Sequence, residues 1–260
     1  KITSSTTTNV SYTAIDDTKW PFNPHSPTIK RHDNYGRYYV FGHFSLLDQA
    51  KEWYYDSVDK KLYLQTENGV EPIDNNIEIA TRKRAVEING DYTTVKGIDI
   101  FAANVRINGR HATFENNTVL HGLQRIDELD NSSAQVGDGS IDVHGQNAVI
   151  KGNTLEHGSL NGIHVPGWGS GDNERGRFVR IEENFIRYFD TAGIHASPLR
   201  IGSRDAKILK NTISHAGRDG VYLSKIDNEF AYNDVSRAGL INNDNGVFYT
   251  VGNTESRNTH

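Results

Sequence analysis

One asparagine position recurs along this chain and constrains its fold more than any other feature. The asparagine closes a short alternating segment and is followed by one residue of any type and then by an apolar residue. Because unrelated loops would not repeat such a pattern, we interpret these segments as structural repeats. Five segments share it: "ATFENN" (Asn117), "AVIKGN" (Asn153), "FVRIEEN" (Asn184), "AKILKN" (Asn211) and "EFAYN" (Asn233).

A second position follows in each segment, where a small residue precedes Ile or Val. In the three middle segments the small residue is Gly162, Gly193 or Gly220, in each case nine residues after the asparagine. The interval is longer in the first and last segments, where Ser140 and Gly246 take this position. A constant interval, with insertions at one place only, indicates successive coils of a single architecture.

The alternation within these segments predicts an all-β fold, a parallel β-helix. Helical periodicity is absent, and neither leucine-rich nor ankyrin repeats fit the spacing. In stacked coils each asparagine lies about 4.8 Å above its counterpart, so that the side-chain amides hydrogen-bond along the stack. The segment "TTVKGIDI" at residues 93–100 fits an earlier coil, with Ile98 in the asparagine position.

The region before the repeats has a different character. We expect residues 1–75 to form a small β-structured cap over the first coil, and residues 76–260 to form the coils. The segment "EWYYDSVDKKLYLQ", residues 52–65, predicts a β-hairpin with a polar turn at residues 57–60. The final "ESRNTH" resembles the first strand of another coil. We therefore expect a C-terminal continuation or a second chain to complete the stack.

Composition argues against several kinds of partner. The net charge is −5 and no basic run is longer than "RKR" at residues 82–84, so nucleic acid is not expected as a partner. No apolar run approaches the roughly 20 residues of a spanning helix, so no membrane association is expected. The chain contains no cysteine, which excludes a disulfide framework and a thiolate metal site.

Strand alternation also predicts which side chains face away from the core. The Ile or Val after the small residue points inward, so the next residue points outward. A column of acidic, imidazole and phenol groups beside acidic turns favours a ligand-binding cleft over an ordinary solvated face. The outward column contains Asp142, His164, His195, Tyr222 and Phe248, a second column begins with His144, and Asp138, Asp219 and Asp244 lie in the turns.

The long insertions are expected to form walls beside this column. One of them, "PGWGSGDNERGR", carries Trp168 among glycines. An exposed tryptophan beside polar residues is a common platform for sugar stacking, and packing over the coil edge is the equal alternative for Trp168. The predicted ligand is therefore an oligo- or polysaccharide.

Glycosidic bond hydrolysis requires two carboxyl groups that face each other across a cleft. Asp219 and Asp244 are the best pair by position, because they occupy nearly equivalent places on consecutive coils and their backbones are expected about 6 Å apart. This separation fits a retaining mechanism. The structural alternative for each is an Asx-turn that caps its own backbone.

Residues from about 40 to the end resemble the right-handed parallel β-helix glycoside hydrolases of the pectin-lyase-like superfamily. The resemblance rests on "LLDQAKEWYYDSVDKKLYLQ", "NTISHAGRDGVYL" and "YNDVSRAGLINNDNGVFYTVGNTESRNTH". The β-xylosidase, α-L-fucosidase and lacto-N-biosidase families on this fold are the nearest in character. The resemblance implies a catalytic carboxylate in an Asp-x-Gly-x-x-Tyr segment, which here falls on Asp244. It also implies a partner carboxylate on a neighbouring coil and a secreted or periplasmic protein.

Two other functions remain open. In a polysaccharide lyase, His164 or His195 would be the base, Tyr222 the acid, and Arg200 or Lys225 the cation that neutralises a uronate carboxylate. A non-catalytic glycan-binding module would keep Trp168 and the wall loops.

No cofactor is expected for this chain. Calcium or zinc is a lesser alternative, because Asp142, His144, His164 and His195 are carboxylate and imidazole groups of the kinds that bind these ions.

Overall fold

The computed structural model of this chain describes residues 2–6, 8–13, 41–73, 77–124, 138–167, 173–191, 193, 195–241 and 245–250. The chain divides into two compact units, Lys1–Ile79 and Ala80–His260. Nearly all regular structure is β. The helices of the described part include two 3-10 turns, η1 (Phe44–Leu46) and η2 (Glu67–Gly69). None of these helices is long and apolar enough to span a membrane.

The first unit contains two antiparallel pairs of strands. β1 (Ile2–Ser5) pairs with β2 (Val10–Tyr12), and β3 (Trp53–Asp56) pairs with β4 (Lys61–Leu64). The β3–β4 pair confirms the predicted hairpin. The ring of Phe44 packs edge-on against Tyr54 and Tyr63, at centroid distances of 5.9 and 4.9 Å. The role of this unit as a cap stays a prediction.

The second unit is built from three parallel sheets. Sheet 1 has seven strands: β5 (Arg84–Ile88), β8 (Asn104–Ile107), β11 (Gly139–Val143), β14 (Asn161–Val165), β17 (Leu199–Ile201), β20 (Val221–Leu223) and β23 (Phe248–Tyr249). Sheet 2 has six: β6 (Thr94–Lys96), β9 (Thr113–Glu115), β12 (Val149–Lys151), β15 (Arg180–Glu182), β18 (Lys207–Leu209) and β21 (Glu229–Ala231). Sheet 3 also has six: β7 (Asp99–Phe101), β10 (Thr118–Leu120), β13 (Thr154–Glu156), β16 (Phe185–Phe189), β19 (Thr212–Ala216) and β22 (Asp234–Ser236).

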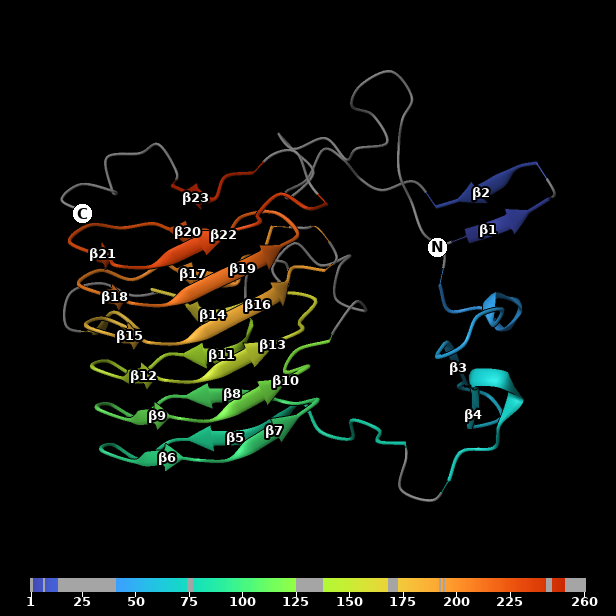
Figure 1. Cartoon of the computed structure of the whole chain (residues 1–260), viewed down its shortest axis with the longest axis horizontal. Helices are drawn as coiled ribbons and strands as arrows, with labels where there is room; N and C mark the ends of the chain where they lie inside the picture. The colour runs from blue at the N-terminus through green and yellow to red at the C-terminus, as the bar shows by residue number, and fades with distance from the viewer. Residues whose placement is uncertain are drawn as a thin grey trace. The chain divides into compact units, whose positions relative to one another are not determined.

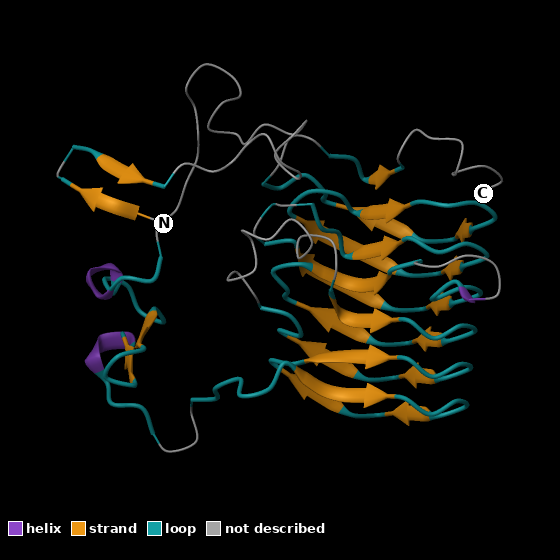
Figure 2. Ribbon diagram, turned by 180° about the vertical axis from the view of Figure 1, so that it is seen from behind, coloured by secondary structure: helices purple, strands orange, loops and turns teal. Residues whose placement is uncertain are grey.

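Successive strands alternate between the sheets in a fixed order. β8, β9 and β10 belong to sheets 1, 2 and 3, and the next strand, β11, returns to sheet 1 beside β8. One round of the chain, meaning a run that adds a strand to each sheet, therefore lies on the preceding round (Figure 1 and Figure 2). This arrangement is compatible with the parallel β-helix that the repeats predict.

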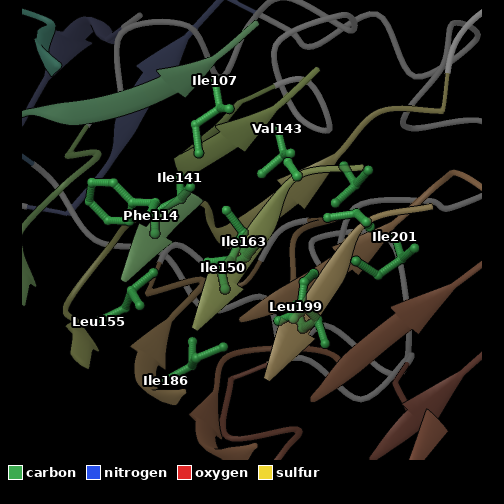
Figure 3. Packing of buried hydrophobic residues seen from close by; sticks show 14 of the residues in the cluster. Ile107, Phe114, Ile141, Val143, Ile150, Leu155, Ile163, Ile186, Leu199 and Ile201 are labelled. Carbon is green, nitrogen blue, oxygen red and sulfur yellow. The ribbon is translucent and has the colours of Figure 1, made fainter. Parts of the chain in front are cut away.

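The core lies between the three sheets (Figure 3). In one round Ile141 comes from sheet 1, Ile150 from sheet 2 and Leu155 from sheet 3, and all three side chains are fully buried. Because side chains alternate along a strand, the residues on either side of each core position face away from the core. Sheet 1 can therefore present polar side chains on its outer face.

The recurrent asparagines form a buried ladder between sheets 2 and 3. The Oδ1 atom of Asn184 accepts hydrogen bonds from the backbone N–H and the Nδ2 group of Asn153, both at 2.9 Å. Its own Nδ2 group donates to the carbonyl of Ile150 at 2.9 Å and to Oδ1 of Asn211 at 3.0 Å. The ladder continues at Asn211, whose N–H donates to Asn233. The predicted structural role of these asparagines is confirmed.

Each turn between sheets 2 and 3 has two residues, and the second one occupies the ladder position. The first residue always has a positive φ, which favours glycine or asparagine, although other residues are held there too. The values run from 53° to 68°, at Gly97, Asn116, Gly152, Glu183, Lys210 and Tyr232. Ile98 occupies the ladder position of the first turn, and its N–H donates to Oδ1 of Asn117 at 3.0 Å, as predicted.

The second repeated position was predicted wrongly in one round. Gly193 was expected to precede the sheet 1 strand, but β17 starts at Leu199 and Leu199 pairs with Ile163. The equal interval of nine residues at Gly193 is a coincidence. β16 extends to Phe189 and a connection follows it, which delays the return to sheet 1. The last round is also displaced by one residue, because Tyr249 and not Phe248 pairs with Tyr222.

Replacing Asn184 by alanine should strongly destabilise the second unit. The variant leaves the buried N–H of Asn153 and the carbonyl of Ile150 without their partners, which is expected to cost about 3 kcal/mol. The free energy of unfolding in urea measures this loss. Asn233→Ala, at the half-buried end of the ladder, should cost about 1 kcal/mol because water can replace the lost bonds. Equal losses would contradict the proposed importance of burial.

Candidate functional site

The outer face of sheet 1 carries a continuous line of polar and aromatic residues. Asp142 lies between Ile141 and Val143, which are core residues, so its side chain is on the opposite face. Strand register then places one residue per round beside it. We call this line the outer column: Arg106, Asp142, His164, Arg200, Tyr222 and Tyr249.

The prediction for this column was right at three positions and wrong at two. Asp142, His164 and Tyr222 occupy it, whereas Arg200 and Tyr249 stand where His195 and Phe248 were expected. His195 is not part of the outer column, because it precedes the sheet 1 strand β17. Its carbonyl accepts a hydrogen bond from Arg200 at 3.3 Å, and its ring is edge-on to Tyr222 at 6.1 Å. His195 thus lies beside the column and not in it.

Asp142 is the centre of the N-terminal half of the column. Its fully buried carboxylate accepts hydrogen bonds from Nε and Nη2 of Arg106 at 3.1 and 2.6 Å. His144 Nε2 approaches it at 3.0 Å, and His164 Nδ1 at 2.9 Å. Burial by itself raises the pKa of the Asp142 carboxyl, but the hydrogen bonds and charges of His144 and His164 outweigh it and hold that pKa well below its usual range. Asp142 is therefore ionised.

These contacts indicate which ring nitrogen of each imidazole donates to Asp142. A carboxylate only accepts, so Nδ1 of His164 carries the hydrogen that is donated to Asp142. Arg175 only donates, and its Nη1 atom lies 3.0 Å from Nδ1 of His144. Nδ1 of His144 is then the acceptor, and its Nε2 carries the hydrogen that reaches Asp142.

Asp138 lies beside the same cluster. Its carboxylate is 2.8 Å from Nζ of Lys83 and 3.2 Å from Nη2 of Arg106. Four residues predicted as substrate-binding are thus brought together around Arg106: Asp138, Asp142, His144 and His164.

The C-terminal half of the column is aromatic and cationic. The Arg200 guanidinium carbon lies 3.9 Å from the ring centroid of Tyr222, and Tyr222 stacks on Tyr249 at 5.7 Å. Burial lowers the pKa of Arg200, which remains a cation at physiological pH, and burial raises the pKa of Tyr222. Tyr222 is therefore a protonated phenol. Lys225, the alternative cation, lies in the turn that follows β20.

Asp219, two residues before β20, is fully buried. Arg218 Nη1, itself buried, lies 2.6 Å from its carboxylate, and the backbone N–H of Gly246 donates to Oδ1 at 3.2 Å. Such contacts suit a structural carboxylate that anchors the chain at Gly246, and they disfavour the catalytic role predicted for Asp219. Asp244 and Trp168 lie outside the described residues.

An open pocket of about 390 Å³ adjoins the Asp142 cluster. Two of its walls are the turns that follow β8 and β11, and the third is part of the insertion "PGWGSGDNERGR", as the loop prediction implies. Its lining comprises Arg106, Asn108, Arg110, His144, Gly145, Gln146, Asn173, Glu174 and Arg175.

Sequence reasoning missed the arginines of this region. The alternation in "NVRI" places Arg106 outward between Val105 and Ile107, so the column could have been extended by one round. That round lacks the asparagine in its preceding turn, where Ile98 stands instead. For Arg175 no sequence signal exists, because its position depends on how the insertion folds back.

A separate group of stacked rings lies where the chain leaves sheet 3. His121 stacks on His157 at 5.0 Å, His157 on Tyr188 at 4.8 Å, and Tyr188 lies 4.5 Å from His215. At the end of this stack, Nη1 of Arg237 lies 2.8 Å from Nε2 of His215. Burial and the charge of His157 lower the pKa of His121, and burial with the charges of Arg237 and Arg187 lowers that of His215.

Acidification should loosen this ring stack. The unfolded chain binds protons with a histidine pKa of about 6.5, and the folded pKa values of His121 and His215 are lower, so stability is lost as pH falls through this range. His157→Phe keeps a stacked ring but removes the charge that opposes protonation of His121. Urea unfolding at about pH 7 and pH 5 should show a smaller loss for this variant than for the wild type. Equal losses of stability in the variant and the wild type would show that His157 does not oppose protonation of His121.

Asp142→Asn should destabilise the fold by about 3–5 kcal/mol at neutral pH, because it leaves Arg106 without its buried partner. The folded pKa of Asp142 lies below the unfolded value, so its contribution is full above about pH 4 and is lost as pH falls toward the folded pKa. The difference between variant and wild type in urea unfolding should therefore shrink in acid. The exposed Asp234→Asn should change stability by less than about 0.5 kcal/mol. If the stability difference between Asp142→Asn and wild type did not change with pH, Asp142 would not be the ionised partner of Arg106.

Comparison with known proteins does not assign this site. No protein-family model matches the chain, and neither a curated protein nor a solved structure matches it significantly. Among the described residues, no three His, Asp or Glu side chains are grouped so that they could hold a metal ion.

Proposed function

We propose that the chain is a carbohydrate-active enzyme on a right-handed parallel β-helix, and that it cleaves a uronate-containing glycan by β-elimination at the outer column. The single observation that carries this proposal is the pair formed by His164 and the buried Asp142. His164 pairs in the sheet with Arg200, which adds a cation on the next round. Resemblance to the β-helical carbohydrate enzymes supports the glycan as substrate and a secreted or periplasmic location.

In β-elimination a base removes the proton α to the uronate carboxyl group. The bond from the β-carbon to the leaving oxygen then breaks, an acid protonates that oxygen, and a double bond remains in the sugar. No water is consumed. The reaction needs a base, a cation that stabilises the carboxylate as charge develops on it, and an acid.

His164 is the proposed base. Its Nδ1–H is held by Asp142, so Nε2 is the nitrogen with a free lone pair. The residue is 4% exposed, and its position is fixed by the buried carboxylate. An ionised partner also stabilises the imidazolium that forms when Nε2 takes the proton. Asp142 is in this mechanism a positioning residue.

Arg200 and Tyr222 supply the other two functions. Arg200 neighbours His164 in the sheet and is a permanent cation suited to a uronate carboxylate. Tyr222 follows on the next round, and its raised pKa keeps the phenol protonated and able to donate. The three groups occupy successive strands and are thus spaced by about 4.8 Å per round.

A glycoside hydrolase is the second candidate, centred on Asp244. It is favoured by the bond from Gly246 N–H to the buried Asp219, which fixes the backbone two residues after Asp244. It ranks second because hydrolysis needs a carboxyl group with a raised pKa as the acid. The described carboxylates near the column are instead ion-paired: Asp138, Asp142 and Asp219. A non-catalytic glycan-binding module is the outcome if neither reaction occurs.

Mass spectrometry of products formed in ¹⁸O-labelled water distinguishes these functions. With a panel of plant, algal and host oligosaccharides, elimination gives an unlabelled product whose mass is lower by one water than that of the hydrolysis product. His164→Gln should reduce the rate by about 100-fold or more. Tyr222→Phe keeps the ring beneath Arg200 and removes only the acid, with a similar loss expected. His121→Gln, a matched change in the ring stack, serves as the control for folding.

Incorporation of ¹⁸O at the new reducing end would rule out the elimination mechanism. If Asp244→Asn then abolished labelling, the hydrolase would replace it. Absence of product from every uronate-containing and neutral sugar would leave only a binding function for the column.

A further inference from the structure

The pocket beside the Asp142 cluster carries more positive charge than the fold itself uses. Three guanidinium groups line it, and one of them, Arg106, is matched by Asp142 and Asp138. Among the described lining residues, Glu174 is the only one with a carboxylate. It is fully buried and lies 2.8 Å from Nε of Arg204, which is outside the pocket.

Within the described part of the chain, Arg110 and Arg175 are the two guanidinium groups of the lining for which no carboxylate partner is found. Arg175 donates to Nδ1 of His144, and no carboxylate of the described residues forms an ion pair with Arg110 or Arg175. Both side chains are exposed at the pocket. The backbone N–H of Arg110 donates to Oδ1 of Asp91 at 2.7 Å, so the backbone from which the Arg110 side chain extends is fixed.

The wall opposite the sheet is fixed to the turns by several bonds. Gly176 N–H donates to the carbonyl of His144 at 3.0 Å, and Nε2 of Gln146 donates to the carbonyl of Glu174 at 2.9 Å. The turns themselves lie in direct contact, because a Cβ atom added to Gly145 would meet the carbonyl oxygen of Gly109 at 1.9 Å. The pocket is therefore formed before any ligand binds, which reduces the entropy lost on binding.

The pocket is continuous with the proposed reaction centre through His144. His144 lines the pocket and contacts Asp142, whose other oxygen holds His164. His144 follows Asp142 by two residues, or about 7 Å along the strand, which is on the scale of one sugar ring. A volume of about 390 Å³ lies in the range of small-ligand sites and exceeds what a bare ion needs.

We propose that this pocket is an anion subsite that binds the carboxylate or sulfate group of the sugar next to the one cleaved. Arg110 and Arg175 would hold the charge, and the amides of Asn108, Gln146 and Asn173 would contact the ring hydroxyls. The inference rests on the proposed function, because it assumes a glycan along the outer column. It narrows the substrate to glycans with acidic groups on adjacent units.

Calorimetric titration of the full chain tests the subsite. The Tyr222→Phe variant serves as the common background, so that slow turnover does not consume the ligand. The probes are three trisaccharides of equal length: one of uronates, one sulfated and one neutral. We expect at least one anionic probe to bind about tenfold or more tightly than the neutral one, and the better anion identifies the substituent.

Arg110→Gln should weaken binding of that anionic probe about tenfold, as expected for one lost charge-assisted hydrogen bond, and should leave the neutral probe unaffected. Arg180→Gln is the matched control, since Arg180 lies on sheet 2 beside Glu182. Thermal unfolding of both variants checks that the fold is retained. Equal binding of all three probes, binding of none, or equal effects of the two substitutions would overturn the subsite.

The two proposals fail in different ways. Anion binding that depends on Arg110 without any turnover of uronate glycans would keep the subsite and remove the lyase. Turnover with unlabelled products and no dependence of affinity on Arg110 would keep the lyase and remove the subsite.

Discussion

The hydrogen bonds between stacked asparagine side chains are the interaction on which the second unit depends. Each buried amide binds the backbone of the round before it and the amide of the round after it. A side chain with one donor and one acceptor group can satisfy both neighbours at once, which neither an apolar residue nor a carboxylate can do. The ladder therefore fixes the rotational register of every round. The alignment of the outer column follows from it.

A second buried group orders that column. The Asp142 carboxylate accepts from one guanidinium and two imidazoles, so a single charge sets the tautomers of His144 and His164 and the position of Arg106. The two halves of the column consequently differ. The N-terminal half is a rigid ionic network, and the C-terminal half is a stack of Arg200, Tyr222 and Tyr249 with the phenol still protonated.

The parts of this structure that repeat were predictable from the sequence, and the parts that do not repeat were not. The ladder asparagines and the outward positions of Asp142, His164 and Tyr222 follow from local spacing and strand alternation. Arg200 was considered only as an alternative, because the extra residues after Asn184 hid the start of β17. The burial of Asp219 was missed because a turn residue does not obey alternation and its partner, Arg218, precedes it directly.

The two-residue turns between sheets 2 and 3 have a consequence for how such a protein can change. The inner turns tolerate no insertion, because each is bound to the ladder on both sides. Length varies instead where the chain passes from sheet 3 to sheet 1 and where it leaves sheet 1, and these are the connections that border the outer column. Loops at such places can be lengthened with little loss of stability. The surface beside the outer column can thus diverge among descendants of this chain while the scaffold that aligns the column is inherited unchanged.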